Sequence, residues 1–146
     1  MRELDELTDL VALLNDATTF CDTADRLISW AQRLTGGEAV VLRLNERSED
    51  GGTWVPACRH AGTNEAFARD EALVSADECV CGRVATGAAD TTLPFFTPYG
   101  SFVWGHVDTI ASHFTPEQLG PIRGRCVSEG YESVAVVPLG GPNGPV

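Results

Sequence analysis

Apolar residues recur with helical spacing near the start of the chain. Between residues 4 and 14, leucine and valine return at steps of three and four, which predicts an amphipathic helix. A second helix is predicted from Asp22 or Thr23, either of which is a candidate N-cap, to the glycine pair at 36–37. The apolar residues of this second helix share one side: Leu27, Ile28, Trp30 and Leu34.

Strand-like alternation follows the two helices. Val40, Leu42 and Leu44 alternate with other residues, which predicts a strand within residues 38–47. After a turn at "SEDGG", residues 53–62 are expected to form the hairpin partner, with the proline of "WVPAC" indicating an edge or a bulge. A closing strand is expected in the segment "YESVAVVPLG".

The middle of the chain predicts shorter elements. Residues 63–73 are weakly helical, and "CGRVATG", residues 81–87, is a short helix closed by glycine. Residues 88–114 are expected to form a long ordered loop with a short strand at 101–106. One helix is predicted over residues 115–130, with a threonine cap and a proline at its first position. Mixed helices and antiparallel strands predict an α+β fold.

The chain ends on a turn-like segment, "GPNGPV", with no strand after it. A hairpin turn normally joins two strands, so we expect the chain to be truncated before its last strand.

The composition of the chain makes some classes of partner unfavourable. The 146 residues include 21 acidic and 10 basic residues, a formal net charge of −11. Such a surface repels phosphate backbones, so we expect no nucleic-acid partner. No apolar run reaches membrane-spanning length, and the acidic N-terminus does not resemble a secretory signal, so we expect no membrane partner in this segment and a cytoplasmic location.

The cysteines are the candidate chemistry. Their number is odd and no secretory context is visible, so buried thiols, a redox pair or a metal site explain them better than a disulfide framework. Cys79 and Cys81 stand at the start of the predicted short helix, where the helix dipole favours a thiolate. In an extended segment, residues two apart point to the same side, so both sulfurs could face one site.

Several short segments of the sequence resemble segments of a known family. "CGRVATG" and "YESVAVVPLGG", in this order and separation, resemble the GAF domain, a sensing module of signal-transduction proteins, over about Leu10 to Val146. Three longer strings, "CVCGRV", "PFFTPYGSF" and "RCVSEGYESVAVVPL", are similar to a GAF subgroup of bacterial and archaeal sensor histidine kinases. The family continues with a further strand, which is absent here.

The resemblance implies a fold and a function. The fold would be an antiparallel sheet with helices on one face and a loop-roofed pocket on the other. Residues 21–146 would be the sensory domain, incomplete at its C-terminus, and residues 1–20 a dimer or relay helix. The domain would bind a small-molecule or redox ligand and control a histidine kinase as a homodimer. Aromatic residues would roof the pocket: Phe95, Phe96, Tyr99, Phe102 and Trp104.

A metal centre is one use of the thiols. With Cys126, which the subgroup resemblance adds, and Cys58, the pair Cys79 and Cys81 makes four candidate ligands. Four thiolates suit an iron–sulfur cluster or, as a weaker expectation, zinc. One axial thiolate, or one of the histidines at 60, 106 and 113, would suit haem. The alternative is that these cysteines are unpaired core residues, as we expect for Cys21.

An enzyme is the competing interpretation. The free-methionine sulfoxide reductases are GAF domains in which one cysteine attacks the sulfoxide and a second forms a disulfide with it. Cys81 and Cys126 would take those two places here, and Asp108 is the one counterpart of the reductases' acidic pocket residues. A third interpretation is a dimer scaffold without a ligand.

Overall fold

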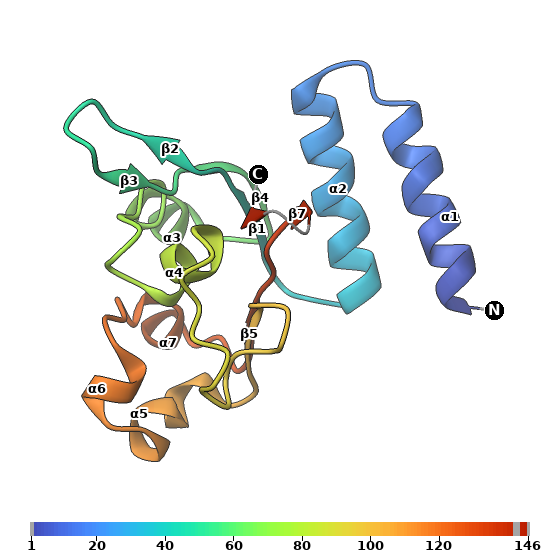
Figure 1. Ribbon diagram of the computed structural model, residues 1–146. Coiled ribbons are helices and arrows are strands. Elements are labelled where there is room, and N and C mark those ends of the chain that lie inside the picture. The colour runs from blue at the N-terminus through green and yellow to red at the C-terminus, as the bar shows by residue number, and fades with distance from the viewer. Residues whose placement is uncertain (1, 142–143, 146) are drawn as a thin grey trace. The chain divides into compact units, whose positions relative to one another are not determined.

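The computed structural model describes residues 2–141, 144 and 145, which form two compact units (Figure 1). The first contains Met1–Arg43 and Ala57–Arg69, and the second contains Leu44–Pro56 and Asp70–Val146. Helices and antiparallel strand pairs are mixed along the chain, which confirms the α+β class. The described strands pair two by two in four antiparallel sheets. A single GAF-like sheet stays a prediction, as does the boundary between residues 1–20 and 21–146.

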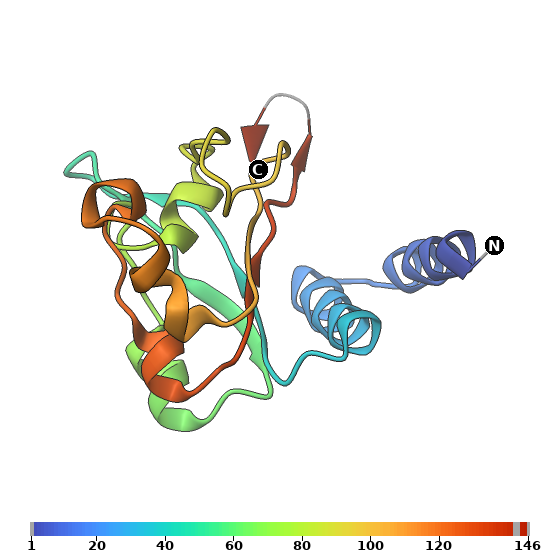
Figure 2. The ribbon, with the colours of Figure 1, turned by 90° about the horizontal axis from the view of Figure 1, so that it is seen from below.

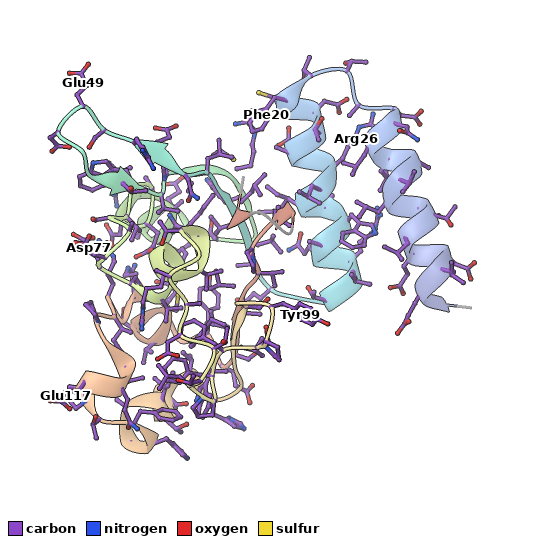
Figure 3. All side chains as sticks on the ribbon, in the orientation of Figure 1. Phe20, Arg26, Glu49, Asp77, Tyr99 and Glu117 are labelled. Carbon is purple, nitrogen blue, oxygen red and sulfur yellow. The ribbon has the colours of Figure 1, made fainter. Side chains whose placement is uncertain are left out.

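The first unit consists mainly of a helix pair and a strand pair. Its elements are α1 (Arg2–Asn15), α2 (Phe20–Thr35), β1 (Val40–Arg43), β4 (Ala57–Ala61) and α3 (Glu65–Asp70). Helices α1 and α2 run antiparallel, side by side (Figure 1). Two side chains of α2 contact α1. Trp30 Nε1 donates to the Glu6 carbonyl at 3.3 Å, and Arg26, labelled in Figure 3, donates to the Leu13 carbonyl at 3.3 Å.

Helix α2 begins earlier than the sequence predicts. Its N-cap is Thr19, whose hydroxyl accepts from the Asp22 N–H at 3.1 Å, so the predicted caps Asp22 and Thr23 are wrong. The Asp22 carboxylate instead accepts from the N–H of Thr18, the residue before the N-cap, at 3.1 Å. Cys21 therefore lies in the first turn and is exposed, which corrects its expected core role.

The strand pair of the first unit carries a bulge at Cys58. Leu42 pairs with Arg59 and Arg43 pairs with Ala57, so Cys58 is the extra residue of β4. The bulge lies two residues after Pro56, where the sequence indicated an edge or a bulge. Burial raises the pKa of the Cys58 thiol, which keeps its proton and makes it a poor ligand or nucleophile.

The second unit holds the short helices around an aromatic core. Its elements are β2 (Glu46–Arg47), β3 (Thr53–Trp54), α4 (Val80–Ala85), β5 (Phe102–Trp104), the 3₁₀ helix η1 (Val107–Thr109), α5 (Ile110–His113), α6 (Pro116–Leu119), α7 (Arg125–Glu129), β6 (Val134–Val136), β7 (Gly140–Gly141) and β8 (Gly144–Pro145). Strand β5 pairs with β6, and α5, α6 and α7 lie on one side of this pair (Figure 2). Buried residues of α4, α5, α6 and the aromatic segment form one core: Val80, Val84, Phe95, Phe96, Phe102, Ile110 and Leu119.

Two short helices replace the single helix predicted over residues 115–130. The predicted start is confirmed, because Thr115 and Gln118 form a capping box with a proline at the first helical position. Helix α6 then ends at Gly120. The φ of 61° and ψ of −168° at Gly120 lie outside the helical region, so the helix cannot continue through it. Residues 120–124 form a loop, and α7 restarts after Gly124 and ends at Gly130, both in the left-handed region.

The C-terminal turn lies partly outside the described residues, because Pro142, Asn143 and Val146 are not among them. The described residues on either side pair as β7 and β8, with Gly140 opposite Pro145. The expected truncation stays a prediction. None of the helices built from described residues combines the length and apolar character needed to cross a bilayer.

Candidate functional site

The segment before α4 is fixed by strand-like contacts. The Val55 N–H donates to the Val74 carbonyl at 2.8 Å, and the Ala76 N–H donates to the Thr53 carbonyl at 2.9 Å. Trp54 and Ser75 form a bridge between these two segments. Residues 74–76 are therefore held against β3, and the chain enters α4 from a fixed position.

Gly82 lets α4 sit directly on this segment. A Cβ added at Gly82 would lie 2.0 Å from the Ala76 carbonyl oxygen, far inside van der Waals contact. The glycine of the "CGRVATG" string is thus required by the close approach of two backbone segments. Its conformation is helical, so flexibility is not the reason for it.

Cys79 is the N-cap residue of α4, and its sulfur is the chemical centre of the site. Its backbone is extended, with φ of −151° and ψ of 164°, and its side chain is half-buried. A hydrogen bond from the Cys81 side chain lowers the pKa of Cys79 to about 6, and the N–H groups of Arg123 and Cys81 act in the same direction. Burial and the nearby Glu71 oppose this shift but do not cancel it. At neutral pH Cys79 is therefore a thiolate.

Arg123 ties the loop that contacts Cys79 to residues 70–78. Its guanidinium donates to Glu71 Oε1 at 3.1 Å, to Glu78 Oε2 at 3.1 Å and to the Asp70 carbonyl at 2.9 Å. The Glu71 side chain is only 7% exposed, so this ion pair lies largely out of water. The Arg123 guanidinium thus anchors the loop to residues 70–78, and the Arg123 N–H also lowers the pKa of Cys79.

Arg83 places a second guanidinium near the thiolate. It lies over the Phe96 ring, 5.7 Å from the centroid, and donates weakly to the Pro121 carbonyl at 3.5 Å. Its buried Nε has no hydrogen-bond partner among the described residues. Burial lowers the pKa of Arg83, and the negative charge of Cys79 opposes that shift. A Cβ at Gly120 would come within 3.1 Å of this guanidinium, so glycine leaves room for it.

The structure brings together two of the four cysteines predicted as metal ligands. Cys79 and Cys81 stand together at the start of α4, where Cys81 lowers the pKa of Cys79, while Cys126 lies in α7, three residues after Arg123, and Cys58 belongs to the first unit. Over residues 2–141, 144 and 145, no three His, Cys, Asp or Glu side chains gather as a metal site requires. The described donors therefore do not fit an iron–sulfur or zinc centre of several ligands, haem with one axial ligand stays a prediction, and we derive no chemistry through any of them.

The histidines offered as haem ligands have other neighbours. His60 Nδ1 lies 2.7 Å from the Thr63 hydroxyl, and His106 Nδ1 lies 3.6 Å from Glu132. His113 packs edge-on against Trp104, with ring centroids 5.7 Å apart. These contacts are the neighbours that the structure gives the three histidines, and their role as haem ligands stays a prediction.

The aromatic residues predicted to roof a pocket form the core of the second unit. Phe95 packs against Phe96 and Phe102, with ring centroids 5.0 and 5.9 Å apart, and all three are buried. Trp104 stacks edge-on against Phe114 at 5.3 Å. Tyr99 stands at the tip of the turn and is 88% exposed (Figure 3). Packing accounts for the buried rings, and their role in ligand binding stays a prediction.

Sequence reasoning missed Arg123 and Glu71. Neither belongs to a recognised string, and the two are 52 residues apart. One weak signal was present: Arg123 lies in a glycine- and proline-containing loop, "GPIRGR", directly before Cys126. A basic residue in such a loop is a candidate anchor, but its partner is not readable from the sequence.

No protein-family model, curated protein or solved structure matches this chain. The assignment of a function therefore depends on the site itself.

Removing the Cys81 donor should raise the pKa of Cys79. We expect the ultraviolet thiolate absorbance of the wild-type chain to titrate with a midpoint near 6, and that of Cys81→Ala to titrate about one pH unit higher or more, because the charged form loses a hydrogen bond. Cys58→Ala, in the first unit, is the control and should leave the midpoint unchanged. An unshifted midpoint in Cys81→Ala would contradict the assigned contact.

Proposed function

We propose that the chain is a sensory domain of GAF type, in a signal-transduction protein, whose input is a chemical change at the Cys79–Cys81 thiol pair. One observation carries the proposal. Cys79 is the N-cap residue of α4, and the pKa of its thiol is lowered to about 6 by Cys81 of its own segment and by the N–H of Arg123, more than forty residues later in the chain. Any modification of this sulfur alters a contact between two distant segments, which is what coupling between an input and a response requires.

The order of elements supports the GAF part of the proposal. Two helices, a strand hairpin, the short glycine-bearing helix α4, the aromatic segment and a strand preceded by a helix follow in the family's order. In the proposed fold, the strand pairs belong to one antiparallel sheet with helices on one face. The glycine of α4 also has a structural reason, the close approach to Ala76.

The first helix supports a proposed homodimer. Leu4, Leu7 and Val11 recur at steps of three and four on α1, and they are 69%, 56% and 56% exposed. A second copy of α1 would cover this stripe, and the helix would then relay the signal to an output domain such as a histidine kinase. A thiolate input needs a reducing compartment, so we place the protein in the cytoplasm.

The reductase interpretation has less support from the site. It requires Cys81 and Cys126 as the attacking and resolving cysteines, whereas the cysteine whose pKa is lowered to about 6 is Cys79. We therefore propose sensing without turnover.

The test is selective alkylation of Cys79 followed by hydrogen exchange. Cys21 is exposed, so the experiment uses a Cys21→Ser background. We expect iodoacetamide to modify Cys79 first at about pH 7, because the thiolate is the reactive form. Amides of residues 120–130 should then exchange roughly tenfold faster, since the Arg123 N–H loses its charged acceptor.

The matched control is Cys79→Ser in the same background, in which alkylation should leave the exchange of residues 120–130 unchanged. Exchange that does not respond to Cys79 alkylation would contradict the sensing role. Multiple-turnover formation of methionine from free methionine sulfoxide, with thioredoxin and NADPH, would establish the reductase instead.

A further inference from the structure

One face of the β5–β6 pair is apolar and exposed. Phe102 is buried in the core, whereas Val103, the next residue of β5, is 50% exposed. Ala135, its partner on β6, is exposed as well. The alternation continues after β6, where Val137 and Leu139 are 61% and 53% exposed. Because successive side chains of a strand point to opposite faces, these residues form one surface, the outer face: Val103, Ala135, Val137 and Leu139.

The outer face is not built like a face that water covers. The solvated face of an antiparallel strand pair normally carries polar side chains. Residues 97–105 and 133–141, which supply both strands and their ends, contain no charged residue. The other face of the pair already has α5, α6 and α7 on its side (Figure 2). A contiguous exposed apolar surface of this kind is typical of an interaction site.

The charges around the outer face are acidic. Residues 84–122 and 126–146 contain no lysine or arginine. The acidic residues of these two segments are Asp90, Asp108, Glu117, Glu129 and Glu132. A cationic partner is attracted to such surroundings, whereas a second copy of this chain would bring the same negative charges to this face.

Two of these carboxylates lie at one end of the strand pair. The Val107 N–H donates to the Glu132 carbonyl at 2.8 Å, which holds the segment after β5 beside the segment before β6. Asp108 and Glu132 are both exposed there, and His106 Nδ1 lies 3.6 Å from the Glu132 carboxylate. An apolar face with carboxylates at its end fits a partner that carries an apolar stripe beside basic side chains.

We propose that the outer face binds a cationic amphipathic helix of a partner protein. The apolar stripe of that helix covers Val103 and Val137, and its lysine or arginine side chains lie near Asp108 and Glu132. A helix suits this place because helices are what normally cover the apolar face of a sheet. An anionic membrane surface is repelled by the same carboxylates. The inference uses no cysteine, so it stands or fails independently of the proposed sensing function.

The experiment measures the binding of a fluorescent peptide to the full chain by anisotropy. The probe is a peptide of leucine and lysine, about 18 residues long so that it forms a helix, with leucine at steps of three and four. We expect Val103→Gln and Val137→Gln each to weaken its binding about tenfold, because each removes the burial of one valine side chain. Glu132→Gln should weaken binding roughly threefold at low salt, and added salt should abolish this difference because it screens the charges.

The matched control is Val127→Gln. Val127 is a partly exposed valine of α7, outside the outer face, so this variant should bind the peptide as the wild-type chain does. A second peptide, with glutamate in place of every lysine, should not bind.

Four results would overturn the inference. Equal binding by Val137→Gln and the wild-type chain would reduce the interaction to a general attraction between opposite charges. Equal binding of the glutamate peptide would remove the role of charge. A dimer that Val137→Gln dissociates would make a second copy the occupant of the outer face. A lower stability of Val137→Gln than of Val127→Gln in urea would show that the chain itself covers this face.

Discussion

Gly82→Ala should destabilise the protein by about 3 kcal/mol or more, enough to unfold much of the second unit. The new methyl group would lie 2.0 Å from the Ala76 oxygen and 2.4 Å from its carbonyl carbon, both backbone atoms. Residues 74–76 are held to β3 by hydrogen bonds at Val55 and Ala76, so they cannot move aside cheaply. Helix α4 would have to lift away, taking Val80 and Val84 out of the core.

The sign of this effect is what makes it informative. Alanine is the better helix former by about 1 kcal/mol, so helix propensity alone predicts that Gly82→Ala stabilises the chain. Gly105→Ala is the matched control, because nothing lies within 4 Å of the added Cβ there. Urea unfolding followed by circular dichroism compares the two. A Gly82→Ala chain as stable as Gly105→Ala would show that α4 does not rest on Ala76.

Arg123→Ala should cost about 3–5 kcal/mol, the second large effect. The substitution leaves the Glu71 carboxylate, 7% exposed, without the guanidinium 3.1 Å away. A buried charge that loses its partner keeps the full cost of leaving water. Adding Glu71→Gln to Arg123→Ala should recover part of the loss, because the double variant buries no negative charge at this position.

An exposed ion pair provides the control. Arg59 lies 3.1 Å from Asp25 in the first unit, where the two side chains are 37% and 64% exposed. Arg59→Ala should cost about 1 kcal/mol or less, because water screens this pair. The measurement is again urea unfolding. An equal loss of unfolding free energy in Arg123→Ala and Arg59→Ala would contradict the importance of the buried contact. A double variant Arg123→Ala, Glu71→Gln that is no more stable than Arg123→Ala would contradict it too.

The stability of the chain should also depend on pH through Cys79. The pKa of Cys79 is about 6 in the folded protein against an ordinary value of 9.0, so folding stabilises the thiolate form of Cys79 over the thiol form. This contribution is complete above about pH 9 and is lost as the pH falls through about 6. The Cys79→Ser chain lacks it, so the difference in stability between the two chains should grow from pH 6 to pH 9.

Local patterns determined the elements. The apolar spacing of residues 4–14 predicted α1, and the capping box at Thr115 was readable because its contacts span three residues. The bulge near Pro56 and the left-handed Gly36 were also local signals. The α+β class, the hairpin strands and the short helix after Cys79 followed from such information alone.

Competition between local signals caused the errors. Thr19 rather than Asp22 caps α2. Both residues are good N-caps and they stand three apart, so the sequence did not distinguish them, and the longer helix that begins after Thr19 is the one that packs against α1. The helix predicted over 115–130 divides because Gly120 adopts a φ of 61°, which frees the loop to carry Arg123 to Glu71. The aromatic segment is a different case: a sequence does not distinguish a core from a cavity lining, so the burial of Phe95, Phe96 and Phe102 leaves the predicted pocket roof a prediction.

The sequence by itself determined that two neighbouring cysteines stand at the start of a short helix and are suited to thiolate chemistry. Only the tertiary structure decided that Cys79 carries the charge, that Arg123 supplies a donor to it, and that Glu71 anchors that loop. The physical reason is sequence separation. Hydrogen bonds within a turn are encoded by adjacent residues, whereas a contact across 52 residues depends on how every intervening loop closes.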